Sequence, residues 1–529
     1  MPTSPVAQTR PEPVLPAFSD VTAASEIAYE TGYLAPYSDL FSPDIAHSAA
    51  AAGDYDDDGD IDLFIVRGDI GPNLLYRNDG DLVFVEVAAD AGIAYTAGGE
   101  ENHKHSAPAF ADMDGDGDLD LFVGGLDYDP SIVFMNNGDG TFTDVTRGSG
   151  LDLAASAFSL SSSFGDYDLD GDVDLAVSHW GTPRDYDDPG DTEHLWRNDS
   201  VGSRIAFTPV SIEAGLSPSI IAHDDPYVPD GIHERDWTFT PTFARIDGDL
   251  YPELLMVADF NHTQLYLNNR DGTFTNVTDP EVLIDGNGMG SAVGDYDNDG
   301  DLDWFVSSIR DTGEVENPSQ SRIGNRLYRN AHGTFEDVSD QAGITDGGWG
   351  WGACFLDFEN DGDLDIYHTN GWGTGAFRGD RSRAFVNLGD GTFEDRGVAL
   401  GLVDGEQGRG VVCADFDNDG DVDIFLLHER CTLWRNNAEG NNHLGIRLIG
   451  VAPNTQALGT RIILHAGGVM QVREVTGGNN YVSQNPSWQT FGLGEATSAE
   501  LTIQWPDGVE TVVVDVAHSQ IVTYTHPDA

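Results

Sequence analysis

Basic residues are scarce in this chain. Its 529 residues include 25 Lys and Arg against 91 Asp and Glu, which gives a formal net charge of −66, and the only lysine is Lys104. So acidic a surface repels the phosphates of nucleic acid and the anionic head groups of membranes, so we expect no nucleic acid partner and no direct membrane insertion. The balance is typical of proteins from salt-loving organisms, where molar salt screens self-repulsion. GC-rich codon usage combined with acidic loops is the alternative explanation.

Cysteines and long apolar runs are scarce as well. Cys354, Cys413 and Cys431 are too few for a disulfide framework. Cys354 and Cys413 lie in comparable hydrophobic stretches, which favours buried thiols, with a Cys413–Cys431 bridge as the open alternative. No apolar run is long enough to span a membrane. Residues 1–16 are polar and Pro-rich without the apolar core of a signal peptide, so we expect a flexible N-terminus and, if the protein is secreted, a leader that has been removed or lies outside this sequence.

A nine-residue acidic loop recurs along the chain. Its first copy, residues 54–62, reads Asp-Tyr-Asp-Asp-Asp-Gly-Asp-Ile-Asp. Carboxylates at positions 1, 3, 5 and 9 surround a hard cation, the glycine at position 6 allows a sharp turn, and position 7 offers its backbone carbonyl. The spacing matches the first nine positions of an EF-hand loop, without the bidentate Glu at position 12. Matching copies start at Asp112, Asp166, Asp295, Asp357 and Asp415, and a damaged copy starts at Arg245.

Six intact loops predict about six Ca²⁺ ions, one per loop. We number the loops 1 to 7 in chain order, the damaged copy being loop 4. Glu359 lengthens one ligand arm in loop 6, which calcium tolerates better than octahedral magnesium does, and transition metals prefer nitrogen or sulfur. The predicted ligand positions are Asp54, Asp56, Asp58, Asp60 and Asp62; Asp112, Asp114, Asp116, Asp118 and Asp120; Asp166, Asp168, Asp170, Asp172 and Asp174; Asp295, Asp297, Asp299, Asp301 and Asp303; Asp357, Glu359, Asp361, Asp363 and Asp365; and Asp415, Asp417, Asp419, Asp421 and Asp423.

Loop 4 lacks two features of the pattern. Arg245 replaces the first carboxylate and Leu250 replaces the turn glycine. We expect the Arg245 guanidinium to pair with Asp247, Asp249 or Glu253 in place of a cation, which leaves loop 4 free of metal. In the other loops a lost ion leaves four carboxylates crowded together, so we expect a mainly structural role for calcium.

The loops are spaced 50 to 79 residues apart, as expected for one four-stranded sheet per repeat. Each unit begins with a strand of small residues, followed by the acidic loop and a hydrophobic strand. A third strand then ends in Asn, as in residues 74–78, and a fourth strand starts at Phe, as in residues 142–145. The last third strand, ending near Asn436, has no fourth strand after it, but the missing copy lies at Phe18–Val21. The sequence therefore predicts an all-β, seven-bladed β-propeller closed by its N-terminal strand, which hides an open sheet edge.

These loops and repeats resemble the FG-GAP/VCBS repeats shared with integrin α-subunit propellers. After Asn442 the motifs change, and residues 444–448, 459–462, 471–475, 491–494 and 503–508 resemble the ASPIC/UnbV domain. The combination is similar to the cartilage acidic protein family, with the propeller over 17–440 and a small β domain over 441–529. The resemblance implies a secreted or cell-surface protein that binds calcium and acts in adhesion or matrix interaction. It implies no general catalytic activity.

The connections opposite the acidic loops are long and rich in aromatic residues and histidines. Exposed tryptophans beside Asp and Asn suit sugar rings, whereas packing of the loops onto the disc is the alternative. Histidines could build a second metal or acid–base site, although they are also ordinary polar loop residues and no catalytic spacing is present. The candidate ligand-binding residues are Trp180, Trp237, Trp349, Trp351, Trp372, His103, His105 and His179.

Three functions remain open from sequence. The first is an adhesion or binding propeller, most simply a monomer, whose loop-rich face meets a glycan or an extracellular protein. The second is an enzyme that acts on a small molecule or polysaccharide in the funnel, with His and Asp as acid and base. The third is a structural matrix component.

Overall fold

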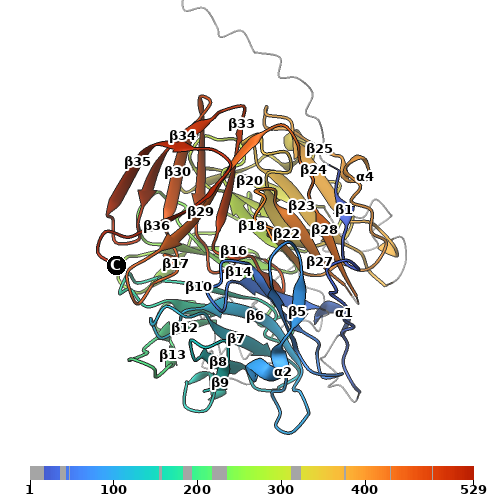
Figure 1. The fold of residues 1–529 in the computed structure, drawn as a ribbon, viewed down its shortest axis with the longest axis vertical. Helices are drawn as coiled ribbons and strands as arrows, with labels where there is room; N and C mark the ends of the chain where they lie inside the picture. Colours follow the sequence, from blue (N-terminus) through green and yellow to red (C-terminus); the bar gives the residue numbers. More distant parts are fainter. Residues whose placement is uncertain are drawn as a thin grey trace, which may run out of the picture.

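The computed structural model describes residues 17–35, 43–46, 48–153, 158–182, 194–216, 235–310, 323–373, 377–428, 430–478 and 480–529. The predicted N-terminal segment 1–16 and parts of the long connections, including residues 183–193, 217–234 and 311–322, lie outside this description. The fold is all-β, as predicted, and consists of successive small antiparallel sheets (Figure 1). No helix in the described ranges is long and apolar enough to cross a membrane.

Six consecutive segments each form a four-stranded antiparallel meander. We call them sheets 1 to 6. They comprise β2 (Ala49–Gly53), β3 (Asp62–Val66), β4 (Leu74–Asn78) and β5 (Phe84–Glu86); β6 (His105–Ala111), β7 (Asp120–Gly125), β8 (Ile132–Asn136) and β9 (Phe142–Asp144); β10 (Ser162–Gly165), β11 (Asp174–Val177), β12 (Leu195–Asn198) and β13 (Phe207–Pro209); β14 (Thr238–Ala244), β15 (Glu253–Ala258), β16 (Gln264–Asn268) and β17 (Phe274–Asn276); β18 (Ser291–Gly294), β19 (Asp303–Val306), β20 (Arg326–Ala331) and β21 (Thr334–Asp337); and β22 (Gly350–Leu356), β23 (Asp365–Asn370), β24 (Arg383–Asn387) and β25 (Phe393–Asp395).

Sheet 7 joins the two ends of the repeat region. Its first three strands are β26 (Val411–Ala414), β27 (Asp423–Leu427) and β28 (Cys431–Arg435), and its fourth is β1 (Ser19–Asp20). Ser19 pairs with Arg435 and Asp20 with Trp434. Phe18 adds an apolar anchor, because it is 6% exposed and its ring meets Phe358 edge-on at 5.7 Å. In Figure 1 the blue strand β1 lies among the orange strands of this sheet, so the predicted pairing of the N-terminal strand is present.

The first strands of the seven sheets are buried and touch one another in chain order. Contacts run from β2 to β6, β10, β14, β18, β22 and β26, and β26 in turn touches β2. These strands consist largely of small residues, such as Ala49–Ala52 in β2, which lets backbones approach closely near an axis. Short helical turns link some sheets: α1 (Pro43–Ala46), α2 (Ala88–Ala91), η1 (Leu151–Leu153), α3 (Ser339–Ala342) and α4 (Gly397–Leu400).

An asparagine at or just after the end of each third strand fastens neighbouring sheets. The side-chain amide of Asn136 donates to the carbonyl of Tyr55 in the preceding sheet at 2.9 Å and to that of Leu119 in its own sheet at 3.1 Å. The Asn78 amide reaches Phe416 of sheet 7 at 2.7 Å. The equivalent bonds to the preceding sheet run from Asn198 to Met113, Asn268 to Tyr167, Asn330 to Ile246, Asn387 to Tyr296 and Asn436 to Phe358. The sequence marked these asparagines only as strand ends.

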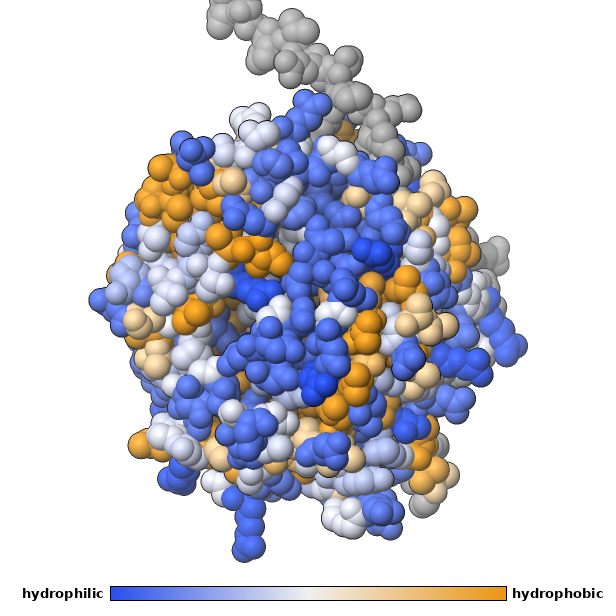
Figure 2. Space-filling model, in the orientation of Figure 1, coloured by the Kyte–Doolittle hydropathy of each residue, from blue (hydrophilic) through white to orange (hydrophobic). Residues whose placement is uncertain are grey.

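The C-terminal part forms two further sheets. One contains β29 (Asn442–Ile449), β33 (Gln489–Gly494) and β36 (Ile521–Thr525), and the other contains β30 (Arg461–Ala466), β31 (Val469–Glu474), β34 (Ser498–Gln504) and β35 (Glu510–Ala517). Figure 1 shows these red strands gathered on one side of the molecule. Figure 2, in the same orientation, shows hydrophilic residues over much of the visible surface, with apolar residues in separate patches.

The link between β31 and β33 leaves this domain and enters the centre of the repeat region. We call residues 477–485 the finger. Its short strand β32 (Ser483–Gln484) pairs in parallel with β2, and Gln484 bonds both the N–H (2.7 Å) and the carbonyl (2.9 Å) of Phe110 in β6. Tyr481 is fully buried, and its ring lies 5.4 Å from Phe239 and 5.3 Å from Trp351. The finger therefore packs against the first strands of sheets 1, 2, 4 and 6, which the sequence did not predict.

All three cysteines are free and buried, as their hydrophobic surroundings predicted. Cys354 and Cys413 lie on the first strands of sheets 6 and 7, whereas Cys431 lies on β28. The alternative Cys413–Cys431 bridge is therefore wrong for this structure.

We predict that Asn136→Leu destabilises the fold by about 1–3 kcal/mol, because two carbonyls lose their buried donor. The measurement is the free energy of unfolding in denaturant. Asn137→Leu is the matched control, since Asn137 is exposed and its side chain bonds only within its own turn. Equal effects of both changes would contradict a fastening role for Asn136.

Candidate metal centres

Two residues in each intact loop adopt a left-handed backbone. The position-6 glycines of the six intact loops have φ between 92° and 108°, as the turn requirement predicted. Position 4 is also left-handed in every loop, with φ of 56° at Asp57 and 57° at Asn418, for example. The sequence pattern missed this requirement, although the Asn, Asp and Gly at most position-4 sites are the residues that tolerate it.

Carboxylates at positions 1 and 5 organise the backbone of the loop. Asp54 accepts hydrogen bonds from the N–H of Asp58 at 3.0 Å and of Gly59 at 3.1 Å, and Asp58 accepts one from Asp60 at 3.0 Å. Asp295, Asp357 and Asp415 repeat the position-1 pattern. The oxygens are thereby turned toward the centre of the loop before any ion binds.

Position 9 has a second task. In loop 1 the two carboxylate oxygens of Asp62 accept the N–H of Tyr55 at 3.1 Å and that of Asn78 at 2.8 Å. Because Asn78 is the residue that bonds the neighbouring sheet, Asp62 connects the loop to the joint between sheets. The equivalent pairs at the third-strand asparagine are Asp120 with Asn136, Asp174 with Asn198, Asp303 with Asn330, Asp365 with Asn387 and Asp423 with Asn436.

Position 3 supplies oxygens that the described protein leaves unbonded. Buried oxygens of Asp56, Asp114, Asp297 and Asp417 have no hydrogen-bond partner among the described residues. Carboxylate oxygens from different positions also lie within 4.8 Å of one another, and the groups include Asp54, Asp56 and Asp58; Asp112, Asp114 and Asp120; Asp166, Asp168 and Asp174; Asp295, Asp297 and Asp299; and Asp357, Glu359 and Asp365. Unpaired buried carboxylates are costly, so this all-oxygen donor set fits a hard cation.

The raised pKa values of the loop carboxyls also indicate that these loops are suited to a bound cation. Burial raises the pKa of Asp62 to about 9 and that of Asp120 to about 8, and neighbouring carboxylates contribute. Burial and neighbouring carboxylates also raise the pKa of Asp54 and Asp166 to about 7. The charged forms are therefore unfavourable in these loops without positive charge nearby.

Loop 4 meets a different arginine from the one expected. Arg245 donates to the backbone carbonyls of Asp249 at 2.6 Å and Gly459 at 3.2 Å, rather than to the carboxylates that the sequence suggested. The carboxylates of Asp249 and Asp247 instead pair with Arg270, which approaches from the β16–β17 turn. The predicted pairing of Arg245 with the loop 4 carboxylates was therefore wrong. Arg245 is buried, and its side chain instead donates to the Gly459 carbonyl of the C-terminal domain. A cation within the chain still faces loop 4.

Neighbouring loops are linked to each other at position 7. Asn360 in loop 6 donates to the carboxylate of Asp421 in loop 7 at 2.6 Å, and Asn418 in loop 7 donates to Asp60 in loop 1 at 2.6 Å. Asn298 in loop 5 reaches Asp363 in loop 6 at 2.9 Å. The side chains at these position-7 sites therefore hold adjacent loops together, in addition to the backbone carbonyl predicted as a ligand.

The C-terminal domain lies directly over the loops. Residues 441–529 contain three basic residues, Arg447, Arg461 and Arg473, and each approaches a loop. Arg447 donates to the Gly59 carbonyl of loop 1 at 2.6 Å and to the Asn418 side chain of loop 7 at 3.1 Å. Its guanidinium also lies 3.5 Å from the ring centre of Trp488, which keeps it in place.

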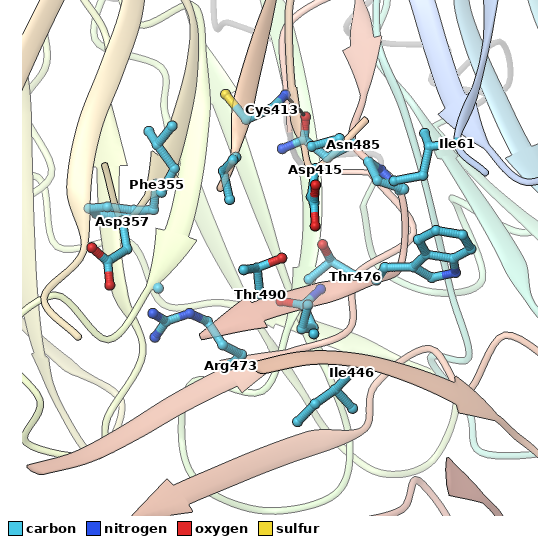
Figure 3. Close-up of a pocket in the computed structure, with 18 of the residues that line it drawn as sticks. Ile61, Phe355, Asp357, Cys413, Asp415, Ile446, Arg473, Thr476, Asn485 and Thr490 are labelled. Atoms are coloured by element: carbon cyan, nitrogen blue, oxygen red, sulfur yellow. Dashed lines mark hydrogen bonds between the residues drawn. The ribbon is translucent and has the colours of Figure 1, made fainter. Parts of the chain in front are cut away.

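Arg473 lies near carboxylates of loops 5 and 6. It is 7% exposed, and although burial lowers its pKa, the nearby carboxylates of Asp357 and Asp295 oppose that shift. Figure 3 shows Arg473 extending toward Asp357 across a cavity whose other walls include Asp415, Asn485 and Thr490. A Cβ added at Gly492 would lie 2.1 Å from an oxygen of Asp357, so only glycine allows this close approach of the domain.

The C-terminal domain also makes polar contacts with other loops. The Thr455 hydroxyl donates to the carboxylate of Asp112, and the Asp112 N–H donates to the Gln456 side chain at 3.0 Å. Asn441 donates to the Glu359 carbonyl at 2.9 Å. At loop 4, Arg461 binds the Arg245 carbonyl and lies 3.2 Å from Glu474, which accepts the Arg245 N–H. In the sequence, these contacts could have been suspected because all three C-terminal arginines lie within the motifs that resemble the ASPIC/UnbV domain.

The candidate tryptophans form two packed groups. Trp349 and Trp372 stack at 4.8 Å with their rings 9° apart, and Trp351 lies beneath them beside the Arg409 guanidinium, 4.2 Å from its ring centre. Trp180 and Trp237 meet edge-on at 5.2 Å in the second group. Trp351 and Trp237 are buried, whereas Trp180, Trp349 and Trp372 keep part of their surface exposed. The packing alternative therefore describes the first two, and ligand contact stays a prediction for the others.

The candidate histidines lie in two places, because the rings of His103 and His105 meet at 5.9 Å whereas His179 lies beside His194. His103 is partly exposed and lies 3.4 Å from Asp129. His105 is buried beside the Pro130 carbonyl, and burial lowers its pKa to about 4, which keeps the ring neutral. His179 lies in another sheet, with its ring 5.1 Å from that of His194. His194 in turn lies 2.6 Å from Asp236.

Family models match the two parts of the chain. The model described as FG-GAP-like repeat matches residues 54–123, 112–177, 235–306, 317–368 and 374–426, which is more than half of the chain. The model described as ASPIC and UnbV matches residues 450–529. The first set of matches contains the acidic loops, and the second contains much of the domain that covers them.

Curated relatives match most of the chain at low identity. Cartilage acidic protein 1 of Xenopus tropicalis is 23% identical over 526 residues, covering 92% of this chain and 75% of its own length. The Mus musculus protein is 25% identical over 503 residues, covering 88% and 71%. The Homo sapiens protein is 24% identical over 516 residues, covering 88% and 70%.

We predict opposite pH dependence with and without divalent metal. Because the pKa values of the loop carboxyls are raised, to about 9 for Asp62 and about 8 for Asp120, these groups stabilise the metal-free protein most below about pH 4, and this contribution is lost as the pH rises through those values. With calcium the carboxylates must be ionised to bind, so acid weakens the protein. Melting temperatures at pH 5 and pH 8 in molar NaCl, with EDTA or with calcium, measure both trends. The same slope in both buffers would contradict the assignment.

Proposed function

The chain belongs to the FG-GAP-like repeat proteins, with a C-terminal ASPIC/UnbV domain, and on this premise we propose that it is an extracellular calcium-stabilised binding protein. Its partner is a glycan or an extracellular protein, which meets the face opposite the acidic loops. The name of its relatives, cartilage acidic protein, supports an extracellular matrix setting.

The observation that carries this proposal is the position of the C-terminal domain. Arg447 and Thr455 contact residues of the loops and Arg473 extends toward Asp357 (Figure 3), so that face is occupied from within the chain. The long connections emerge at the other ends of the strands, on a scaffold fixed by hydrogen bonds between sheets. Loops on a rigid scaffold are where binding usually resides.

The Trp349–Trp372 stack is the candidate contact surface. Both rings are partly exposed and rest on Trp351 and Arg409, so their orientation is fixed before a ligand arrives. Flat aromatic faces stack on sugar rings and also serve as anchors in protein interfaces. The buried Tyr481 of the finger packs below Trp351, which links this surface to the C-terminal domain.

Calcium is the cation that the loops fit best. The donors are all oxygens, and the set in loop 6 accepts Glu359 in place of Asp. We propose six ions per chain, in loops 1, 2, 3, 5, 6 and 7, with a mainly structural role. Dissociation constants on the order of 0.1–1 mM are usual for extracellular modules.

We also propose that the seven sheets are the blades of a closed propeller. The cycle of contacts between first strands, the return of β26 to β2, and the seven asparagine bonds that run from each sheet to its predecessor support a ring. The β1–β28 pairing is its final joint.

A binding screen tests the function. The protein is assayed against polysaccharides and matrix proteins in calcium and molar salt, and product release is followed in the same wells. We expect a ligand that is retained unchanged, with binding at least tenfold weaker for Trp372→Ala. Trp488→Ala is the control, because Trp488 lies beside Arg447 at the loop face. Cleavage of the ligand would favour an enzyme, and self-association alone would favour a structural matrix role.

A truncation tests closure of the ring. Deleting residues 1–22 removes Phe18 and β1, so we expect the melting temperature to fall by at least several degrees. A deletion of residues 1–16 is the control and retains every residue of the joint. An unchanged melt for the longer deletion would rule out the N-terminal strand as a latch.

A further inference from the structure

Every third strand carries an aromatic residue and an asparagine separated by one variable residue. That variable residue is Arg77, Arg197, Arg329 and Arg435 in sheets 1, 3, 5 and 7, whereas sheets 2, 4 and 6 have Met135, Leu267 and Val386. The four arginines therefore occupy one structural position beside the loop of their own sheet. What each guanidinium binds depends on the acids that its surroundings offer.

In sheets 1, 3 and 5 the arginine bonds an acid outside the loop. Arg77 binds Asp79 at 2.7 Å and Arg197 binds Asp199 at 2.9 Å, where the acid directly follows the asparagine. Arg329 binds Glu336 at 2.6 Å, and Glu336 is its register partner on the fourth strand. In the described structure, each of these three guanidinium groups thus forms its ion pair with an acid outside its own loop.

Sheet 7 offers Arg435 neither kind of acid. The residue after its asparagine is Asn437, whose side-chain amide donates to the Ala17 carbonyl at 2.6 Å and so helps to hold the N-terminal strand. The register partner of Arg435 on β1 is Ser19. Arg435 turns instead into loop 7, where it lies 2.7 Å from Asp417 and 3.1 Å from Asp419. These residues occupy positions 3 and 5, two of the predicted ligand positions.

We propose that Arg435 is a tethered competitor of calcium, which makes loop 7 the weakest of the six intact metal sites. The inference rests on the proposed calcium function and adds a difference among its sites. A divalent ion in loop 7 must share Asp417 and Asp419 with a guanidinium or displace it, whereas the equivalent arginines of loops 1, 3 and 5 are already paired elsewhere. Among the other arginines near the loops, Arg270 pairs with carboxylates of the damaged loop 4, and Arg447 donates to the Gly59 carbonyl of loop 1 and to the Asn418 side chain.

The competition between Arg435 and calcium takes place next to the pairing of the two ends of the repeat region. Asp423 of loop 7 holds Asn436, Asn436 bonds sheet 6, and β28 pairs with β1, so loop 7 lies beside the joint between the chain ends. At low calcium the guanidinium offsets the loop carboxylates and keeps this joint intact. At high calcium the ion takes over, and Arg435 is released toward solvent, where its side chain is already 41% exposed.

The size of the effect follows from Coulomb repulsion. A unit charge about 5 Å from a divalent ion in a partly solvated site weakens binding by at least about tenfold, and salt reduces the difference. We therefore expect five stronger sites and one weaker site in the native chain. Removal of the Arg435 charge should bring the sixth site into the range of the others.

The test is a calcium isotherm of the full chain by titration calorimetry at low ionic strength. Arg435→Met should raise the affinity of the weakest site about tenfold, and methionine is the residue that sheet 2 carries at this position. Arg77→Met is the matched control, because Arg77 pairs with Asp79 outside loop 1, and it should leave the weakest site unchanged. Ser19→Glu is a second variant that gives Arg435 an acid partner as in sheet 5, and it should also strengthen the site.

Each outcome has one meaning. Five strong sites and one weak site that both sheet 7 variants strengthen support the proposal. Six equivalent sites, or a weak site that neither variant changes, overturn it and leave the calcium function intact. If no protein binds calcium, the proposed function fails first, which separates the two failures. Melting temperatures in EDTA establish that each variant is folded.

Discussion

The acidic loops crowd several carboxylates into short turns on one face of the repeat region. Other features of the structure depend on how the negative charge of these carboxylates is compensated. Burial and like charges raise the pKa of Asp62, Asp120 and Asp54 far above the usual range, so each loop needs positive charge nearby. The chain supplies some of it internally. Arg270 faces the damaged loop 4, Arg435 enters loop 7, and Arg447 and Arg473 approach from the C-terminal domain. The remaining loops keep unbonded oxygens suited to a cation.

The same loops also determine how the sheets join. A position-9 carboxylate such as Asp120 fixes the backbone N–H of Asn136, and the side chain of Asn136 bonds the preceding sheet. A cation in loop 2 would therefore act on the joint between two sheets through a chain of two hydrogen bonds. This arrangement gives a physical reason for the proposed structural role of metal, because the predicted ligand Asp120 is hydrogen-bonded to the residue that fastens two sheets.

The C-terminal domain is more than an appendage of the repeat region. It covers the loops, and its finger contributes Gln484 and Tyr481 to the centre, where small residues of the first strands leave space. A single domain thereby contacts both the acidic loops and the Trp351 cluster. The opposite face is left to the long connections, which is why we place a partner there.

The sequence by itself predicted the all-β class, the repeated four-stranded sheets and the turn glycines, since each depends on residues within one short segment. It also predicted the pairing of residues 18–21 with the last repeat, because a missing strand can be counted. Only the tertiary structure decided that Arg270 rather than Arg245 meets the loop 4 carboxylates, that three C-terminal arginines cover the loops, and that the finger packs against the first strands of several sheets. These contacts join residues far apart in the chain, and spacing within a segment carries no information about which distant charge or side chain will lie opposite.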